Sequence, residues 1–449
     1  MLLKLLFLLI FLFSAGCSSE LVVSGGVVNR GKLREVQAGV AAMRGLKFKA
    51  EVPVEVKNRA EMKRYFERDI EEEYGEEKLK NLALAYAKLG LFPQGVDLKK
   101  ALVDFYGAQV VAFYDPRTKK LVLPESLATE ETIGAAQSDD RRDIIGEMVL
   151  AHELMHALQD QHFSLGERMS PSSTGDKDLA LRAVAEGDAT LSGFGYLFGG
   201  LDQKYLVVIK QGVQDSIQEA RSSVGDIPEA IVEELLFQYY GGVSFVSRLL
   251  EERGWSGVDR VYASPPLSTE QVLHPEKYLV SPDPPTRVEI KDLSALFPPD
   301  WKEIENAVLG ELMTQVLFKR FLSEDEAKMV AGGWDGDRFV AFSRGDEIAF
   351  IWATVWDSPQ DAEEFFQGYQ RIVAKKYPDP KSVSAAYNER RDQRVVVVEG
   401  LEKDQVKERI EKIWQGMELT EEPFISPFPE VPHRLPEKNQ GGAAHQAAP

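Results

Sequence analysis

Cysteine is almost absent from this chain of 449 residues, because Cys17 is the only one. An internal disulfide, a thiolate metal site and a cysteine nucleophile are therefore excluded from the folded domain. Histidine is also scarce, with six residues, so a regular spacing between two of them carries information. A catalytic centre in this protein must be built from His, Glu, Asp, Ser, Lys or Tyr.

Positive charge is in short supply as well. The chain has 53 Lys and Arg against 72 Asp and Glu, which gives a formal net charge of −19. Binding to nucleic acid needs a basic surface that neutralises phosphates, and docking to anionic lipid needs a similar patch. We therefore expect no nucleic-acid partner. The length allows one large domain or two to three smaller ones.

A long apolar run is missing from the N-terminus. The run at residues 5–13 is too short to cross a bilayer, which takes roughly 20 apolar residues. Small residues and then Cys17 follow it, as in a secretory signal. The segment resembles a bacterial lipoprotein signal, although Ser14 replaces the usual aliphatic residue. This resemblance implies removal of residues 1–16 and an exported protein that a lipid on Cys17 anchors to a membrane, facing the periplasm or the cell exterior. Secretion without an anchor is the alternative.

Two histidines are spaced for a metal site. His152 and His156 lie in the sequence AHELMH, on a helix predicted to begin at Asp139 or Asp140. Side chains four residues apart project from one face of a helix, so both imidazoles can contact one metal ion. In this HExxH motif Glu153 is the general base. Two neutral nitrogen donors beside an open position suit catalytic zinc, the cofactor that we expect.

The third ligand is open between two residues. His162 stands where an HExxHxxGxxH site has its third histidine, but Gln159 replaces the glycine that breaks the helix in that pattern. In an unbroken helix His162 lies about 9 Å further along the axis than His156. Glu186, on the next predicted helix, is the other candidate and the one that we favour. Asp188, two residues later, would orient a ligand imidazole.

The residues HELMHALQDQHF, followed by AVAEGDAT, resemble the gluzincins, in which a glutamate from a second helix completes a His-His-Glu site. FYDP at residues 113–116 and STEQVLHPEKY at residues 268–278 extend the resemblance to a poorly characterised group of bacterial zinc peptidase-like lipoproteins. The similarity covers much of residues 91–278. It implies a zincin-like fold and an endopeptidase that hydrolyses peptide bonds. The zinc ligands that it implies are His152, His156 and Glu186.

Peptide hydrolysis also needs a donor for the oxyanion, which gluzincins take from a downstream His or Tyr. His274 is the first candidate, and Tyr239 or Tyr240 the next. The substrate would be an extended polypeptide that adds to a strand at residues 109–114, which forms a predicted hairpin with residues 121–123. Zincins place such an edge strand beside the active helix.

Two other functions share the same zinc centre. A zinc-containing lipoprotein without hydrolytic activity would serve as a chaperone-like or scaffold binding protein, with its C-terminal part as the binding module. A metal-dependent hydrolase of another bond would use the same three ligands. A panel of peptide, ester and amide substrates separates these alternatives.

The fold class that we expect is α+β and mainly helical. After a tether at residues 17–34, a zincin-like metallopeptidase domain with its active-site helix and a small antiparallel sheet covers residues 35–300. A proline-rich crossing segment marks the boundary to a small α+β domain at residues 301–418. Residues 419–449 are rich in proline, glycine and alanine, and we predict that they are disordered.

Overall fold

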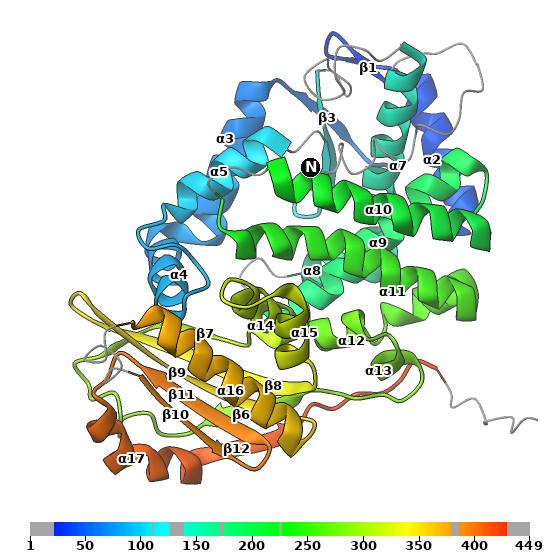
Figure 1. Cartoon of the computed structure of the whole chain (residues 1–449). Helices are drawn as coiled ribbons and strands as arrows, with labels where there is room; N and C mark the ends of the chain where they lie inside the picture. The colour runs from blue at the N-terminus through cyan, green and yellow to red at the C-terminus, as the bar shows by residue number, and fades with distance from the viewer. Residues whose placement is uncertain are drawn as a thin grey trace, which may run out of the picture.

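The structure is a computed structural model that describes residues 22–109, 112–125, 139–169, 175–223, 227–378 and 386–428. The predicted signal with Cys17 and most of the predicted disordered tail lie outside the described residues. The protein has a mixed α+β fold and is mainly helical, as predicted. Figure 1 shows long helices at one end of the molecule and a β-sheet with its covering helices at the other.

The N-terminal end of the described chain has regular secondary structure, where we predicted a tether at residues 17–34. A short hairpin of β1 (Val23–Ser24) and β2 (Val27–Val28) leads into α2 (Arg30–Arg44). Asn29 caps this helix, because its side-chain oxygen accepts two backbone N–H groups of the first turn. The helix then packs against the helices that carry the candidate site.

The helical part combines four long helices, α7 (Asp139–Phe163), α9 (Asp176–Phe198), α10 (Gln203–Ser223) and α11 (Glu229–Val261), with shorter ones around them. The shorter ones are α3 (Arg59–Glu73), α4 (Gly75–Leu89), α5 (Leu98–Gln109), α8 (Leu165–Arg168), α12 (Thr269–Leu273) and α13 (Glu276–Leu279). Apolar residues of α4, α9, α10 and α11 form one continuous core with the C-terminal part.

Two glycines bring α9 and α11 into close contact. A Cβ atom added to Gly187 would lie 2.2 Å from the backbone of Gly242, and one added to Gly242 would lie 2.0 Å from the carbonyl oxygen of Ala183. Only glycine permits this approach of the two backbones. The contact fixes the middle of α9 against α11.

The small sheet beside α7 is mixed, where we predicted an antiparallel one. β4 (Phe113–Asp115) and β5 (Lys120–Pro124) form the predicted antiparallel hairpin, and β3 (Val54–Lys57) joins parallel to β5. The first strand of the hairpin begins at Phe113, because α5 continues to Gln109. The strand order is β3-β5-β4, so β4 is an edge strand among the described residues.

The C-terminal part is built on a five-stranded antiparallel sheet of order β10-β11-β9-β8-β7. Its elements, with the strands and helices around the sheet, are β6 (Thr286–Ile290), β7 (Lys302–Ala307), α14 (Gly310–Lys319), α15 (Glu324–Ala331), β8 (Trp334–Arg344), β9 (Glu347–Trp356), α16 (Pro359–Lys376), β10 (Ala386–Arg391), β11 (Arg394–Glu399), α17 (Lys403–Gly416) and β12 (Met417–Glu421). Helix α16 packs on one face of the sheet and α17 on the other (Figure 1).

The prediction of disorder from residue 419 is wrong as far as residue 428. β12 pairs with β6 in antiparallel register, and the rings of Phe424 and Phe428 lie 5.4 Å and 6.3 Å from that of Tyr278. The chain therefore crosses back to the helical part after β12. β6 lies before the predicted boundary at residue 300 but pairs with β12, which follows α17. The position of the domain boundary stays a prediction.

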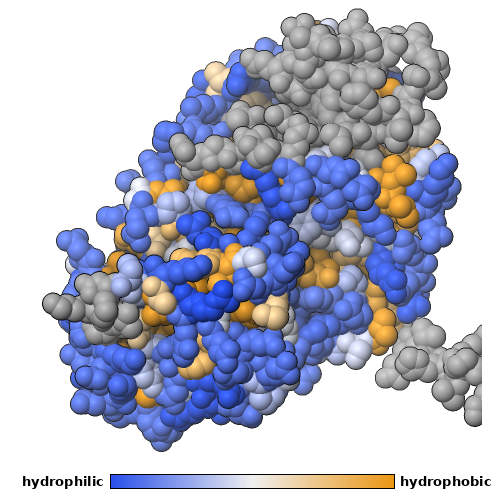
Figure 2. Space-filling view, viewed as in Figure 1, coloured by the Kyte–Doolittle hydropathy of each residue, from blue (hydrophilic) through white to orange (hydrophobic). Residues whose placement is uncertain are grey.

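The surface in the view of Figure 2 is mainly hydrophilic, with apolar side chains in small groups. This agrees with the high content of charged residues. Among the residues that the structure describes, no helix has both the length and the apolar character needed to cross a membrane.

Candidate metal centre

Helix α7 presents His152 and His156 on one face. The helix forms because apolar residues line its buried sides, and Met148, Leu150 and Leu154 are fully buried there. The imidazole ring centroids are 4.7 Å apart and the rings are nearly perpendicular. The Nε2 atoms of the two rings are 3.0 Å apart, so both nitrogens point to one place, as the spacing predicts.

Glu186 of α9 brings a carboxylate to the same place. Its Oε2 atom is 3.1 Å from Nε2 of His152, and its Oε1 atom is 3.4 Å from Nε2 of His156. The side chains of His156 and Glu186 are 17% and 19% exposed, so the group can be reached from solvent. We call these three residues the histidine cluster.

The histidine cluster is electrostatically coupled. Burial by itself would raise the pKa of Glu186, but the two imidazoles outweigh it and hold that pKa well below its usual range. Burial would lower the pKa of His156, and Glu186 instead raises it to about 9. Glu186 and His156 thus stabilise each other's charged form.

Glu153 lies beside this cluster and contacts the edge strand. Its side chain is buried, and its Oε2 atom accepts the backbone N–H of Tyr114 in β4 at 2.9 Å. Burial raises the pKa of Glu153, partly offset by the nearby imidazoles. The predicted base therefore stands between the histidine cluster and the side of β4 that has no partner strand among the described residues.

The structure brings Glu186, and not His162, to the two histidines. Helix α7 continues to Phe163 without a break, as expected with Gln159 in place of glycine. The Nε2 atom of His162 is 2.8 Å from the carbonyl oxygen of Lys47, on another side of the helix. His162 therefore does not belong to the histidine cluster.

His274 also lies elsewhere. Its Nε2 atom is 3.0 Å from the carboxylate of Glu311 in α14. It ends α12, whose first residue, Thr269, is hydrogen-bonded to Asp176 at the start of α9. Ten residues of helix separate Asp176 from Glu186, or about 15 Å. The structure thus does not bring His274 into the centre as an oxyanion donor.

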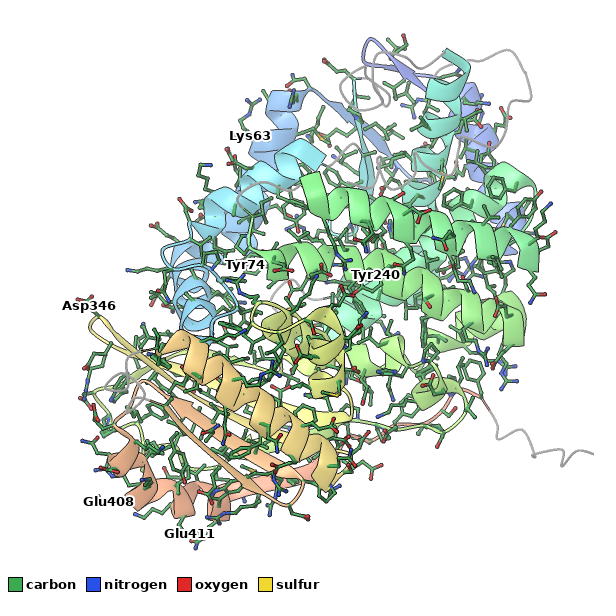
Figure 3. All side chains as sticks on the ribbon, in the orientation of Figure 1. Lys63, Tyr74, Tyr240, Asp346, Glu408 and Glu411 are labelled. Carbon is green, nitrogen blue, oxygen red and sulfur yellow. The ribbon has the colours of Figure 1, made fainter. Side chains whose placement is uncertain are left out.

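Tyr239 of α11 takes the place next to the cluster. Its ring centroid is 6.5 Å from that of His152, and the Glu186 carboxylate, after burial, contributes to the raised pKa of its hydroxyl. Tyr240 packs instead against Phe237, with Arg221 on its ring, and Figure 3 shows it on α11. Of the two predicted tyrosines, only Tyr239 contacts the histidine cluster.

We predicted that Asp188 orients a ligand imidazole, but it contacts His156 only through Gln159. It is fully buried and bound by Arg44, Tyr262 and Gln159, and it is Gln159 that contacts His156. We did not predict these three partners from the sequence. The available signal was the position of Gln159, which follows His156 by three residues and so shares its helix face.

A second group of side chains could also hold a metal by its geometry. Glu270, Asp283 and Asp357 bring carboxylate oxygens within 4.8 Å of one another. The Lys277 ammonium lies 2.6 Å from Glu270, 2.9 Å from Asp283 and 2.7 Å from Asp357. We call the three acidic residues the carboxylate cluster, and the protein supplies its cation.

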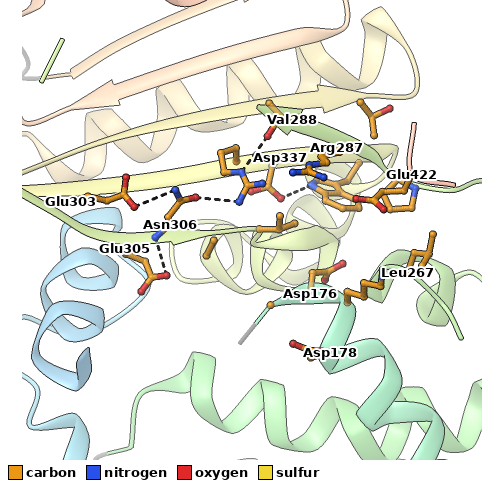
Figure 4. A pocket seen from close by; sticks show the side chains of 18 of the residues that line it. Asp176, Asp178, Leu267, Arg287, Val288, Glu303, Glu305, Asn306, Asp337 and Glu422 are labelled. Atoms are coloured by element: carbon orange, nitrogen blue, oxygen red, sulfur yellow. Dashed lines mark hydrogen bonds between the residues drawn. The ribbon is translucent and has the colours of Figure 1, made fainter. Parts of the chain in front are cut away.

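A cavity of about 690 Å³ lies apart from both clusters, between the start of α9 and the strands β6 and β7. Figure 4 shows Asp176 and Asp178 on the helix side, opposite Arg287 and Glu303 on the strands. Its lining mixes cations, carboxylates and apolar side chains. Asp176, which lines the cavity, is the first residue of α9. Ten residues of this helix therefore separate it from Glu186.

The chain matches one family model. The model is described as a domain of unknown function (DUF8575) and covers residues 297–409. The match includes all five strands of the C-terminal sheet and leaves the histidine cluster outside. No curated protein and no solved structure matches the chain.

Proposed function

We propose that the chain is a zinc-dependent endopeptidase with a zincin-like fold and a gluzincin-type centre. The observation that carries the proposal is the meeting of three features at one place. The histidine cluster converges, Glu153 lies beside it, and Glu153 is hydrogen-bonded to β4, an edge strand among the described residues. Each feature has a separate task in metal-assisted hydrolysis of an extended peptide.

The histidine cluster fits zinc in both donor type and spacing. A tetrahedral zinc with ligand bonds of about 2.0 to 2.2 Å places neighbouring ligand atoms about 3.3 to 3.6 Å apart. The corresponding separations here are 3.0, 3.1 and 3.4 Å. His152, His156 and Glu186 would hold the ion, which when bound would acidify a water molecule and polarise the substrate carbonyl.

Glu153 and Tyr239 would handle the proton and the developing charge. Burial makes the Glu153 carboxylate a stronger base than an exposed one, and it would accept the proton from water and pass it to the leaving amine. Tyr239 keeps its proton at neutral pH, because burial and the neighbouring carboxylates raise its pKa well above the usual value. Its hydroxyl can therefore donate to an oxyanion.

The edge strand β4 would bind the substrate. The Tyr114 N–H is directed to Glu153 and so away from β5, on the side of β4 that lacks a partner strand among the described residues. A peptide that pairs with this edge would lie beside the base and the histidine cluster. An extended polypeptide is therefore the substrate class that we propose.

Export and a lipid anchor are part of the same proposal. They depend on the apolar run and on Cys17, which lie outside the described residues. The protein would then act on polypeptides at the periplasmic or outer side of a membrane.

The test compares three forms of the purified protein without its signal: the parent, Glu153→Gln and Glu186→Ala. Zinc content and hydrolysis of casein and of a mixed peptide library are measured for each. We expect one zinc per parent chain with hydrolysis. Glu153→Gln should keep its zinc and lose activity by about 10²- to 10⁴-fold. Glu186→Ala should lose both.

Other outcomes select the alternatives. One zinc per chain without turnover on peptides, esters or amides would favour a zinc-containing chaperone-like or scaffold lipoprotein. Turnover on esters or other amides alone would favour a hydrolase of another bond. Full zinc retention in Glu186→Ala would reject Glu186 as a ligand.

A further inference from the structure

Gln159 connects the histidine cluster to a buried charged group behind it. It follows His156 by three residues on α7, and its Oε1 atom is 2.9 Å from Nδ1 of His156. The side chain of Gln159 is fully buried. A polar amide in such a place needs hydrogen-bond partners on both of its ends.

The partners of the amide nitrogen determine the orientation of Gln159. Its Nε2 atom lies 2.9 Å from the carbonyl oxygen of Ala185 and 3.2 Å from Oδ2 of Asp188. Both of these atoms only accept hydrogen bonds, so the NH₂ group must face them and Oε1 must face His156. His156 is then the donor through Nδ1–H, which leaves Nε2 of the neutral ring as its bare nitrogen.

Asp188 is itself held by partners from other helices. Arg44 of α2 binds both oxygens of Asp188, at 2.9 Å and 3.3 Å, and the Tyr262 hydroxyl donates to Oδ2 at 2.8 Å. Arg44, Asp188 and Tyr262 are all almost fully buried. This group fixes the carboxylate that fixes Gln159.

The two imidazoles differ in this respect. Nδ1 of His152 is buried and has no hydrogen-bond partner among the described residues. The orientation of His152 therefore follows from packing and from Glu186, whereas that of His156 follows from a directed hydrogen bond.

We propose that Gln159 is the positioning residue of this centre. It holds His156 with the proton on Nδ1 and Nε2 directed to the metal, and the Arg44–Asp188 pair holds Gln159. A neutral amide thus replaces the carboxylate that commonly contacts a ligand histidine. The inference rests on the metal centre of the proposed function and does not require hydrolysis.

The first test is zinc affinity, measured by competition with a chelator. Gln159→Met keeps the shape of the side chain and removes the acceptor, and we expect a loss of about 10- to 100-fold in affinity. Gln159→Glu keeps the acceptor for His156 but turns an oxygen to Ala185 and Asp188. It should lower the thermal midpoint and keep the affinity within a few-fold of the parent. Ser192→Ala, which removes another hydrogen bond to Asp188, is the matched control and should bind zinc like the parent.

A purely structural role predicts a different pattern. In that case the affinities of both Gln159 variants would follow their thermal midpoints, and the proposal would be overturned. A parent-like affinity of Gln159→Met would overturn it as well.

The second test needs no variant. In zinc-loaded parent protein with ¹⁵N-labelled histidine, His156 should show a slowly exchanging proton on Nδ1 and a metal-bound Nε2. The reverse assignment would overturn the proposal. A parent that binds zinc without hydrolysing peptides would reject the peptidase function and leave this inference standing, whereas a parent that binds no zinc would reject both.

Discussion

The histidine cluster and the carboxylate cluster have similar spacing and different sources of positive charge. In each, three ligand atoms lie within 4.8 Å of one another. Lys277 contacts all three residues of the carboxylate cluster, so that group is completed within the protein. The histidine cluster contains nitrogen donors on which a metal ion can replace a proton. Spacing alone therefore does not identify a metal site. A group whose centre is already filled by a lysine ammonium, as in the carboxylate cluster, does not need a metal ion.

The largest effect should come from removing a nitrogen donor. We expect His156→Ala to weaken zinc binding by about 1000-fold or more, because it removes one of the three proposed ligands. His162→Ala and His274→Ala are the matched controls and should bind zinc like the parent, since both lie outside the cluster. Chelator competition measures all three. Equal zinc binding in His156→Ala would remove the distinction between the two clusters.

The second prediction concerns the cation of the carboxylate cluster. Lys277→Met leaves the buried Glu270 without its partner and should lower the free energy of unfolding by about 3 to 5 kcal/mol. Millimolar calcium should then raise the thermal midpoint of the variant and leave that of the parent unchanged. Urea denaturation and thermal scans give both quantities. A variant as stable as the parent would show that Lys277 does not compensate the carboxylates.

The third prediction concerns Asp176, a buried carboxylate whose hydrogen-bond partners carry no positive charge. The hydrogen-bond partners of Asp176 are the N–H and hydroxyl of Thr269, and burial raises its pKa to about 8. Between about pH 4 and pH 8 the folded protein keeps a proton that the unfolded chain loses, so stability falls as the pH rises. Asp176→Asn should remove roughly 1 to 3 kcal/mol of this fall, measured by urea denaturation near pH 5 and pH 8. An identical fall in parent and variant would contradict the assignment.

The smallest effect should come from an exposed ion pair. The side chains of Lys302 and Glu77 are 68% and 75% exposed, and water screens their attraction. Lys302→Ala should leave the urea midpoint unchanged, in contrast to Lys277→Met. A clear shift of that midpoint would mean that burial does not decide how much an ion pair contributes to stability.

The convergence of His152 and His156 could be predicted from the sequence, because their spacing on a helix places them on one face. The choice of Glu186 followed from Gln159, since without a glycine α7 continues past His162. The long helices and the β4–β5 hairpin could also be predicted, because their patterns are local.

The groups behind the ligands could not be predicted. Arg44, Gln159, Asp188 and Tyr262 come from four helices or helix ends, and none of them is unusual in its own segment. His274 was expected in the centre because gluzincins take an oxyanion donor from downstream in the chain. No local pattern tells which end of α9 His274 approaches. β12 was missed because four of its five residues are exposed and it lacks the alternation of a half-buried strand.

The contacts among Arg44, Gln159, Asp188 and Tyr262 determine when the support of His156 can form during synthesis of the chain. These residues lie between positions 44 and 262, so a growing chain cannot complete the support of His156 until the end of α11 has left the ribosome. Contacts of such long sequence separation form late in folding, after local helices. A stable metal centre at this place should therefore form only after residue 262 has emerged, and fragments that end before residue 262 should bind zinc weakly even though they contain the entire HExxH sequence.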